Sequence, residues 1–160
     1  MKNNIQNKDQ RIPVGLGVFV VIFNRDFSKI LLLKRNEEKR IRWNADWGNI
    51  GGSMESREHS LDAGIREAKE EIGLELDKNQ IRLIEVIEKP NFSETYHGIH
   101  FAYATTIDES APIKINPESD EFRWFEVDNL PEKMLDKPEF IKEVRDKAIK
   151  IFGKEINLNS

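Results

Sequence analysis

The chain has 160 residues and a net charge of −4, with 38% hydrophobic and 34% charged side chains. This length suits one domain with a sizeable core, and the composition is that of an ordinary globular protein. The negative charge argues against a broad nucleic-acid or anionic-membrane surface, and the absence of cysteine excludes disulfides and thiol nucleophiles.

The first third of the chain predicts two strands followed by a polar connection. Val14 to Asn24 is apolar and rich in β-branched residues, which is typical of a buried strand. A turn over Asn24–Ser28 leads into a second predicted strand at Lys29–Arg35, so the pair predicts a hairpin. The polar stretch Asn36–Asn49, which contains two tryptophans, is predicted to be a loop.

The remaining elements predict a sheet covered by two helices. The first predicted helix runs from about His59 to Ile72, and the second has helical spacing over Pro138–Phe152. Between them we predict strands at Ile81–Ile87, Ile99–Ile107 and Phe122–Val127. Strands mixed with two helices indicate an α/β fold with helices on both faces of the sheet. We expect a single domain over residues 12–155, with a polar N-terminal segment (1–11) and a polar C-terminal tail (156–160).

The first predicted helix carries an acidic cluster. Its apolar stripe consists of Leu61, Ile65, Ala68 and Ile72. Glu67, Glu70 and Glu71 stand at i, i+3 and i+4, so all three project from one side of the helix and repel one another by roughly 0.2–0.5 kcal/mol per pair. A solvated acidic face is the simple interpretation. A bound divalent cation is the other, since hard cations such as magnesium prefer carboxylate oxygens.

The window from Gly52 to Leu74 resembles the signature box of the Nudix (MutT-like) hydrolase family, G-x5-E-x7-R-E-U-x-E-E-x-G-U, where U is a bulky aliphatic residue. The residues on its fixed positions are Gly52, Glu58, Arg66, Glu67, Glu70, Glu71, Gly73 and Leu74. Ala68 departs from the pattern, because alanine is small where a bulky residue is usual. The resemblance implies a Nudix-type α/β/α sandwich with a mixed sheet.

The resemblance also implies a metal-dependent pyrophosphohydrolase. Such an enzyme cleaves a phosphoanhydride of a nucleoside diphosphate linked to a group X, with Mg²⁺ or alternatively Mn²⁺ as the cofactor. The implied metal ligands are the Gly51 carbonyl and the carboxylates of Glu67, Glu70 and Glu71. Glu67 is either a ligand or the general base, and Arg66 would hold one of these carboxylates in place.

Five further residues, inside and outside the box, have two interpretations each. Glu58 is either a metal ligand or a favourable charge near the helix N-terminus. Glu118 and Glu121 are candidates for a further ligand or base, by resemblance to a segment that precedes a tryptophan-bearing strand, or else belong to a charged turn. Arg35, at a strand end beside Lys34, and the Gly52 backbone are candidate phosphate-binding groups. A solvated strand end and a flexible turn are the alternatives for these two.

The substrate stays open between two classes. Pro90 follows the box at a spacing found in some ADP-ribose-type relatives, whereas Arg42–Gly52 and Glu118–Glu121 resemble hydrolases of oxidised nucleoside triphosphates. A non-catalytic nucleotide-sensing Nudix domain is the alternative function, and a related diphosphate isomerase is disfavoured because it relies on a cysteine. We expect a small nucleotide partner, no nucleic acid, no membrane, and leave a homodimer open. No apolar run reaches membrane-spanning length and no signal-peptide core is present, so a cytoplasmic location is expected.

Overall fold

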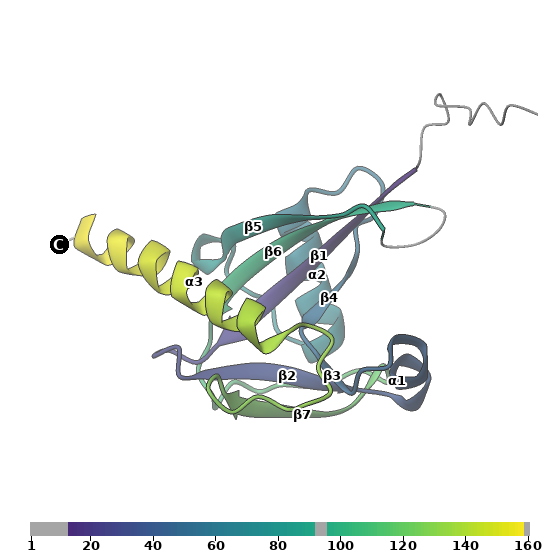
Figure 1. Ribbon diagram of the computed structural model, residues 1–160. Coiled ribbons are helices and arrows are strands. Elements are labelled where there is room, and N and C mark those ends of the chain that lie inside the picture. Colours follow the sequence, from purple (N-terminus) through teal and green to yellow (C-terminus); the bar gives the residue numbers. More distant parts are fainter. Residues whose placement is uncertain (1–12, 92–95, 159–160) are drawn as a thin grey trace, which may run out of the picture.

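The computed structural model describes residues 13–91 and 96–158 (Figure 1). The predicted segment 1–11 lies outside this range. In chain order the elements are β1 (Val14–Phe23), β2 (Lys29–Arg35), α1 (Glu37–Trp43), β3 (Trp47–Gly48), β4 (Ile50–Ser53), α2 (Ser60–Ile72), the 3-10 turn η1 (Lys78–Gln80), β5 (Arg82–Lys89), β6 (His97–Thr106), β7 (Ser119–Glu126) and α3 (Pro138–Leu158).

The strands form one mixed sheet. Its main path runs β3-β2-β1-β6-β5, and β4 and β7 pair with β1 and β2 respectively. β1 and β6 are parallel along their whole length, from Val14 opposite His97 to Phe23 opposite Thr106. The other pairs of named strands are antiparallel. β1 and β2 meet at their turn, where Phe23 pairs with Ile30, so the predicted hairpin is confirmed.

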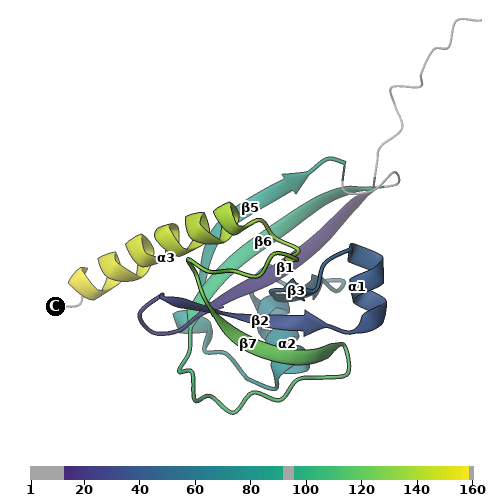
Figure 2. The ribbon, with the colours of Figure 1, turned by 60° about the horizontal axis from the view of Figure 1, so that its bottom comes forward.

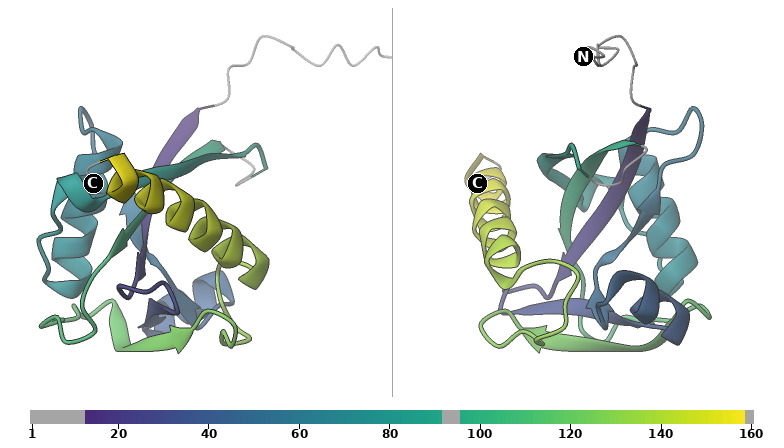
Figure 3. Two further views of the ribbon diagram at one scale, coloured as in Figure 1. Left: turned by 90° about the vertical axis from the view of Figure 1, so that its left-hand side faces the viewer. Right: turned by 45° about the vertical axis from the view of Figure 1, so that its right-hand side comes forward.

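Alternating residues of β1 face two separate layers of core. Val18, Val20 and Ile22 pack in the cluster that includes the apolar side of α2, whereas Val21 and Phe23 pack in the cluster that includes α3. This alternation follows from the two-residue period of a strand. Figures 2 and 3 show α2 and α3 on opposite faces of the sheet. The predicted α/β/α sandwich is confirmed.

Helix α2 is anchored as its sequence predicts. Ala68 and Ile72 are fully buried, and Leu61 and Ile65 pack against the same cluster. A side chain at Gly64 would place its Cβ 3.1 Å from Cγ2 of Val20, so glycine lets the helix lie close to β1.

Three local predictions need correction or extension. The predicted loop 36–49 is wrong, because it contains helix α1 and the short strand β3. Helix α3 continues past the predicted Phe152 to Leu158, into the segment predicted as a tail. Among the described residues, no helix is both long and apolar enough to cross a membrane.

Gly73 at the end of α2 and Gly153 within α3 give a matched pair of substitutions. Gly73 ends α2 with φ +69°, and its N–H donates to the Lys69 carbonyl at 3.1 Å. Gly73→Ala is expected to lower the free energy of unfolding by about 1 kcal/mol, because the left-handed region is strained for alanine. Gly153→Ala is expected to raise it by about 0.5 kcal/mol, since Gly153 is helical and its Cβ would meet nothing within 4 Å. Urea unfolding of both variants measures these changes, and a change of the same sign in both would contradict the different roles of the two glycines.

Candidate active site

Two of the three clustered carboxylates lie between α2 and β4. Glu67 and Glu71 are buried, with 9% and 6% of their surface exposed, whereas the Glu70 side chain is 54% exposed. The N–H of Gly51 donates to Oε2 of Glu71 at 2.9 Å. The helical spacing therefore puts three carboxylates on one side, but packing against β4 buries only two of them.

The glycines of β4 make this packing feasible. A Cβ on Gly52 would lie 2.4 Å from Oε1 of Glu67, and a Cβ on Gly51 would lie 2.3 Å from the Val18 carbonyl oxygen. Neither distance is sterically allowed. The pair is thus required by the close approach of the helix and of β1 to the β4 backbone.

Arg66 ties the acidic residues of the box together. Its guanidinium donates to Glu58 at 2.8 and 3.1 Å, to Glu67 at 2.9 Å and to Glu70 at 3.3 Å. It also donates to the Ser53 carbonyl of β4 at 3.1 Å. The hydrogen bonds from Arg66 lower the pKa of Glu58 and raise the pKa of Arg66 itself. Glu58 in this structure therefore binds Arg66, which neither interpretation from the sequence anticipated.

Burial changes the acidity of the two enclosed carboxylates. Burial raises the pKa of Glu71 to about 7, against the lowering effects of the Gly51 N–H and the nearby Lys39 ammonium. Burial also raises the pKa of Glu67, although its hydrogen bond to Arg66 opposes this shift. Negative charge at this position is costly by itself, so a cation that arrived there would be strongly favoured.

The two carboxylates considered outside the box lie in different surroundings. Glu118 forms an ion pair with Lys39, and its charge helps raise the pKa of both Glu67 and Glu71. Glu121 instead binds Arg123 at 2.5 Å and lies 3.9 Å from Lys34. The structure brings Glu118 to the carboxylate cluster and leaves Glu121 on the outer strand β7.

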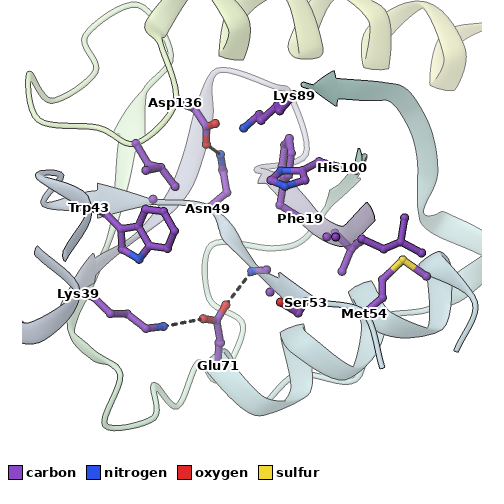
Figure 4. Close-up of a pocket in the computed structure, with 18 of the residues that line it drawn as sticks. Phe19, Lys39, Trp43, Asn49, Ser53, Met54, Glu71, Lys89, His100 and Asp136 are labelled. Carbon is purple, nitrogen blue, oxygen red and sulfur yellow. Dashed lines mark hydrogen bonds and ion pairs between the residues drawn. The ribbon is translucent and has the colours of Figure 1, made fainter. Parts of the chain in front are cut away.

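A cavity of about 850 Å³ opens beside Glu71 (Figure 4). Its lining includes the basic side chains Arg35, Lys39, Arg42 and Lys89 and the aromatic rings of Phe19, Trp43, Tyr96 and His100. The two kinds of side chain are interspersed, because Trp43 lies next to Lys39 and the Lys89 charge acts on His100. The cavity thus combines basic and aromatic side chains, which suits a ligand with a ring system and an anionic chain.

Glycines in β1 make room for two of the rings that line this cavity. A Cβ at Gly15 would lie 2.7 Å from the Tyr96 ring, and a Cβ at Gly17 would lie 3.1 Å from the His100 ring. Burial lowers the pKa of His100, which favours its neutral form. The rings of Tyr96 and His100 therefore lie against bare strand backbone and form an aromatic wall of the cavity.

Arg35 adds a partly buried cation to the cavity. Burial lowers the pKa of its guanidinium, while the charges of Glu71 and Asp136 act in the opposite direction. Within residues 13–91 and 96–158 its Nε has no hydrogen-bond partner, and no ion pair within 4 Å is formed by its side chain. An anionic ligand would compensate this charge.

Two contacts in the site are not among the predictions from the sequence. Lys39 contacts the carboxylate cluster from α1, and the Asn49 amide donates to Asp136 at 2.9 Å across the cavity wall. Asn36 followed by Glu37 and Glu38 is a helix-start pattern that predicts α1 and would have placed Lys39 in its first turns. No comparable signal marks the Asn49–Asp136 contact, because it joins residues 87 positions apart.

The donor set suits a hard divalent cation. Across the described part of the chain, no three acidic or histidine side chains are already converged as a metal-binding group. Glu67 and Glu70 hold Arg66, and Glu71 holds the Gly51 N–H. Their oxygens and the Gly51 carbonyl are nevertheless the type of ligand that magnesium and manganese take, and two of these carboxylates are buried with raised pKa.

This fold and this box define a Nudix domain. The NUDIX domain family matches residues 13–144, so the chain belongs to this family and the prediction from the box is confirmed. Dihydroneopterin triphosphate diphosphatase of Escherichia coli (strain K12) is 29% identical over 97 residues. That alignment covers 61% of each protein, so the chain spans about three fifths of this curated relative's length.

Solved structures agree on the fold. The MutT NUDIX hydrolase from Burkholderia pseudomallei superimposes with a TM-score of 0.67 at 24% identity, over 82% of this chain and 97% of that one. The dihydroneopterin triphosphate pyrophosphohydrolase of Escherichia coli superimposes with a TM-score of 0.61 at 19% identity, over 84% of this chain and 95% of that one.

Gly52→Ala tests the packing of Glu67 against β4. The new methyl group would displace the Glu67 carboxylate, which is the movable end of a side chain, so the fold should survive. We expect Mn²⁺ affinity to fall by about 10- to 100-fold, the usual effect of disturbing how a metal ligand is held. Titration calorimetry measures this, with Gly153→Ala as the same substitution far from the site. Unchanged affinity in Gly52→Ala would show that the position of Glu67 does not matter for the metal.

Proposed function

We propose that the protein is a divalent-metal-dependent pyrophosphohydrolase that cleaves a phosphoanhydride of a nucleoside diphosphate linked to X. The observation that carries the proposal is the pair of buried carboxylates, Glu67 and Glu71, beside a cavity with basic and aromatic walls. Two buried carboxylates this close together are destabilising, and a divalent cation would offset more of their charge than Arg66 and Lys39 do. The partner is a small nucleotide.

Among candidate substrates, a triphosphate ester of an aromatic heterocycle comes first. The curated relative is a diphosphatase of dihydroneopterin triphosphate, which is such a compound. The cavity supports this choice, because its lining combines aromatic rings that can stack on a ring system with basic side chains that can bind a phosphate chain. Oxidised nucleoside triphosphates belong to the same chemical class, and an ADP-ribose-like substrate is the second candidate.

The proposed roles follow from the contacts in the site. Glu67, Glu70, Glu71 and the Gly51 carbonyl would hold the cation. When bound, such a cation neutralises the diphosphate and lowers the pKa of water, usually as Mg²⁺ and alternatively as Mn²⁺. Arg66 positions Glu67 and Glu70 through its hydrogen bonds.

The base that activates water and the groups that bind phosphate are proposed among the carboxylates of the site and the lining of the cavity. Glu67 and Glu118 are the candidates for the base that accepts the proton of the attacking water, because both lie in the carboxylate cluster. Glu121 is the weaker candidate, since it faces Arg123 and Lys34. Arg35 and the Gly52 backbone would bind the phosphate chain, and the aromatic wall would stack on the ring system.

Activity is tested with a substrate panel at neutral pH with magnesium. The panel contains nucleoside triphosphates, an oxidised triphosphate, dihydroneopterin triphosphate and ADP-ribose, and release of pyrophosphate or monophosphate is measured. We expect turnover of at least one triphosphate.

Glu70→Gln and Glu71→Gln should each lower kcat/KM by about 10²-fold or more with the fold intact, because each removes a charge that the cation needs. Glu75→Gln, an exposed carboxylate just beyond α2, is the matched control. Tight nucleotide binding without turnover across the panel would favour a sensing domain instead.

A metal-dependent gain in stability is expected in the same site. The repulsion between Glu67 and Glu71 exists only in the folded chain, so a divalent cation should bind the folded state preferentially. At ten times its Kd the gain is about 1.4 kcal/mol, which corresponds to a rise in Tm of roughly 3–6 °C. Glu71→Gln should reduce the rise. Calorimetric melting in EDTA and in magnesium measures both, and an equal rise in the two proteins would place the cation elsewhere.

A further inference from the structure

Lys39 lies inside the carboxylate cluster without being part of the box. Its ammonium Nζ is 3.8 Å from Oε1 of Glu71 and forms a close ion pair with Glu118. The Lys39 side chain is 29% exposed and that of Glu71 is 8% exposed. Among the described residues, Lys39 is the one cation within 4 Å of Glu71.

Hydrogen bonds between separate segments hold Lys39 in this position. Asn36 caps α1 by accepting from the Lys39 N–H at 3.0 Å, and its own N–H and amide donate to the carbonyls of Glu118 and Pro117. The N–H of Asn116 in turn donates to the Glu71 carbonyl at the end of α2. These contacts join α1, the segment before β7 and the box helix, and Lys39 stands where the three meet.

The charges around Lys39 are unequal. Glu67, Glu71 and Glu118 act on one another as like charges, and Arg66 is engaged by Glu58, Glu67 and Glu70. Lys39 therefore supplies the positive charge that Glu71 and Glu118 share. A divalent cation bound to these carboxylates would repel the ammonium from them, since like charges a few ångströms apart repel even in a polar site.

A second environment for the ammonium lies directly beside the first. Lys39 also lines the cavity, together with Arg35 and Arg42. Figure 4 shows the Lys39 side chain pointing toward Glu71. A lysine side chain has enough rotatable bonds to leave a carboxylate for a phosphate oxygen without moving its backbone.

We propose that Lys39 is a built-in counter-ion of the carboxylate site, which competes with the divalent cation for Glu71 and Glu118 and transfers to the phosphate chain of the substrate once the cation binds. This inference rests on the proposed function for the identity of the cation and of the phosphate chain. Lys39 is a positioning residue, because removing it should strengthen the binding of the divalent cation and weaken the binding of the substrate.

The test compares Mn²⁺ binding to the 160-residue chain and its variants by titration calorimetry. Lys39→Met should bind Mn²⁺ about two- to tenfold more tightly than the wild type, because the competing charge is gone. Lys39→Arg keeps the charge and should stay near the wild-type affinity. Lys29→Met is the matched control: Lys29 is 33% exposed and pairs with Glu109 at 2.9 Å, at the opposite end of β2. It should leave Mn²⁺ affinity unchanged, so a general effect of net charge is separated from the local one.

Two further measurements distinguish this role from a purely structural one. In thermal melts, Lys39→Met should show a larger Mn²⁺-induced rise in Tm than the wild type. With the substrate found in the panel, its KM should rise several-fold while kcat changes less. A loss of packing at position 39 would instead weaken the metal and the substrate together.

The outcomes separate the two proposals. If the wild type binds Mn²⁺ and Glu71→Gln does not, the metal site stands and Lys39→Met decides the inference. Equal or weaker Mn²⁺ binding by a folded Lys39→Met would then overturn it. If the wild type binds no Mn²⁺, or Glu71→Gln binds it equally well, the metal site of the proposed function fails first.

Discussion

The structure of the site depends on the burial of two carboxylates against bare backbone. Glu67 approaches β4 closely because Gly52 carries no side chain, Gly51 lets β1 lie close to the same strand, and the Gly51 N–H donates to Glu71. Burial makes the negative charge expensive, and the molecule offsets this with Arg66, with a backbone N–H and with Lys39. The steric requirement for glycine and the electrostatic demand for a cation are thus two consequences of one contact between a helix and a strand.

The rest of the fold keeps that contact in place. Ala68 and Ile72, on the other side of α2, are fully buried against β1, and the left-handed residue Gly73 ends the helix where the chain turns toward β5. Because β4 pairs with the same strand that α2 packs on, both partners of the contact are fixed to β1. The carboxylates can therefore lie in an unfavourable electrostatic environment, since the apolar packing of the same helix compensates for it.

The sequence predicts most of the layers and part of the site. Period and composition place β1, β2 and α2 closely, because long apolar segments and a helical stripe leave few alternatives. The prediction of a loop over residues 36–49 is wrong because it relied on their polarity, although Asn36 and the acidic residues after it form a helix start. Among the site residues, the spacing of the box located Glu67 and Glu71. The position of Glu118 beside them, and of Glu121 away from them, depends on the register of β7 and on Lys39, which local sequence does not specify.

Odd-numbered and even-numbered residues of β1 face two different parts of the protein. Val18 and Val20 face the box helix, whereas Gly15, Gly17 and Phe19 face the aromatic wall of the cavity. The rings of Tyr96 and His100 therefore lie on the face of β1 away from the core that holds α2, although the cavity that they line also reaches Glu71. A substitution at either ring is expected to leave the packing of α2 unchanged. In such an arrangement the residues that line the ring-binding part of the cavity can change while the box helix stays the same. Relatives could therefore differ in substrate and share one set of carboxylates.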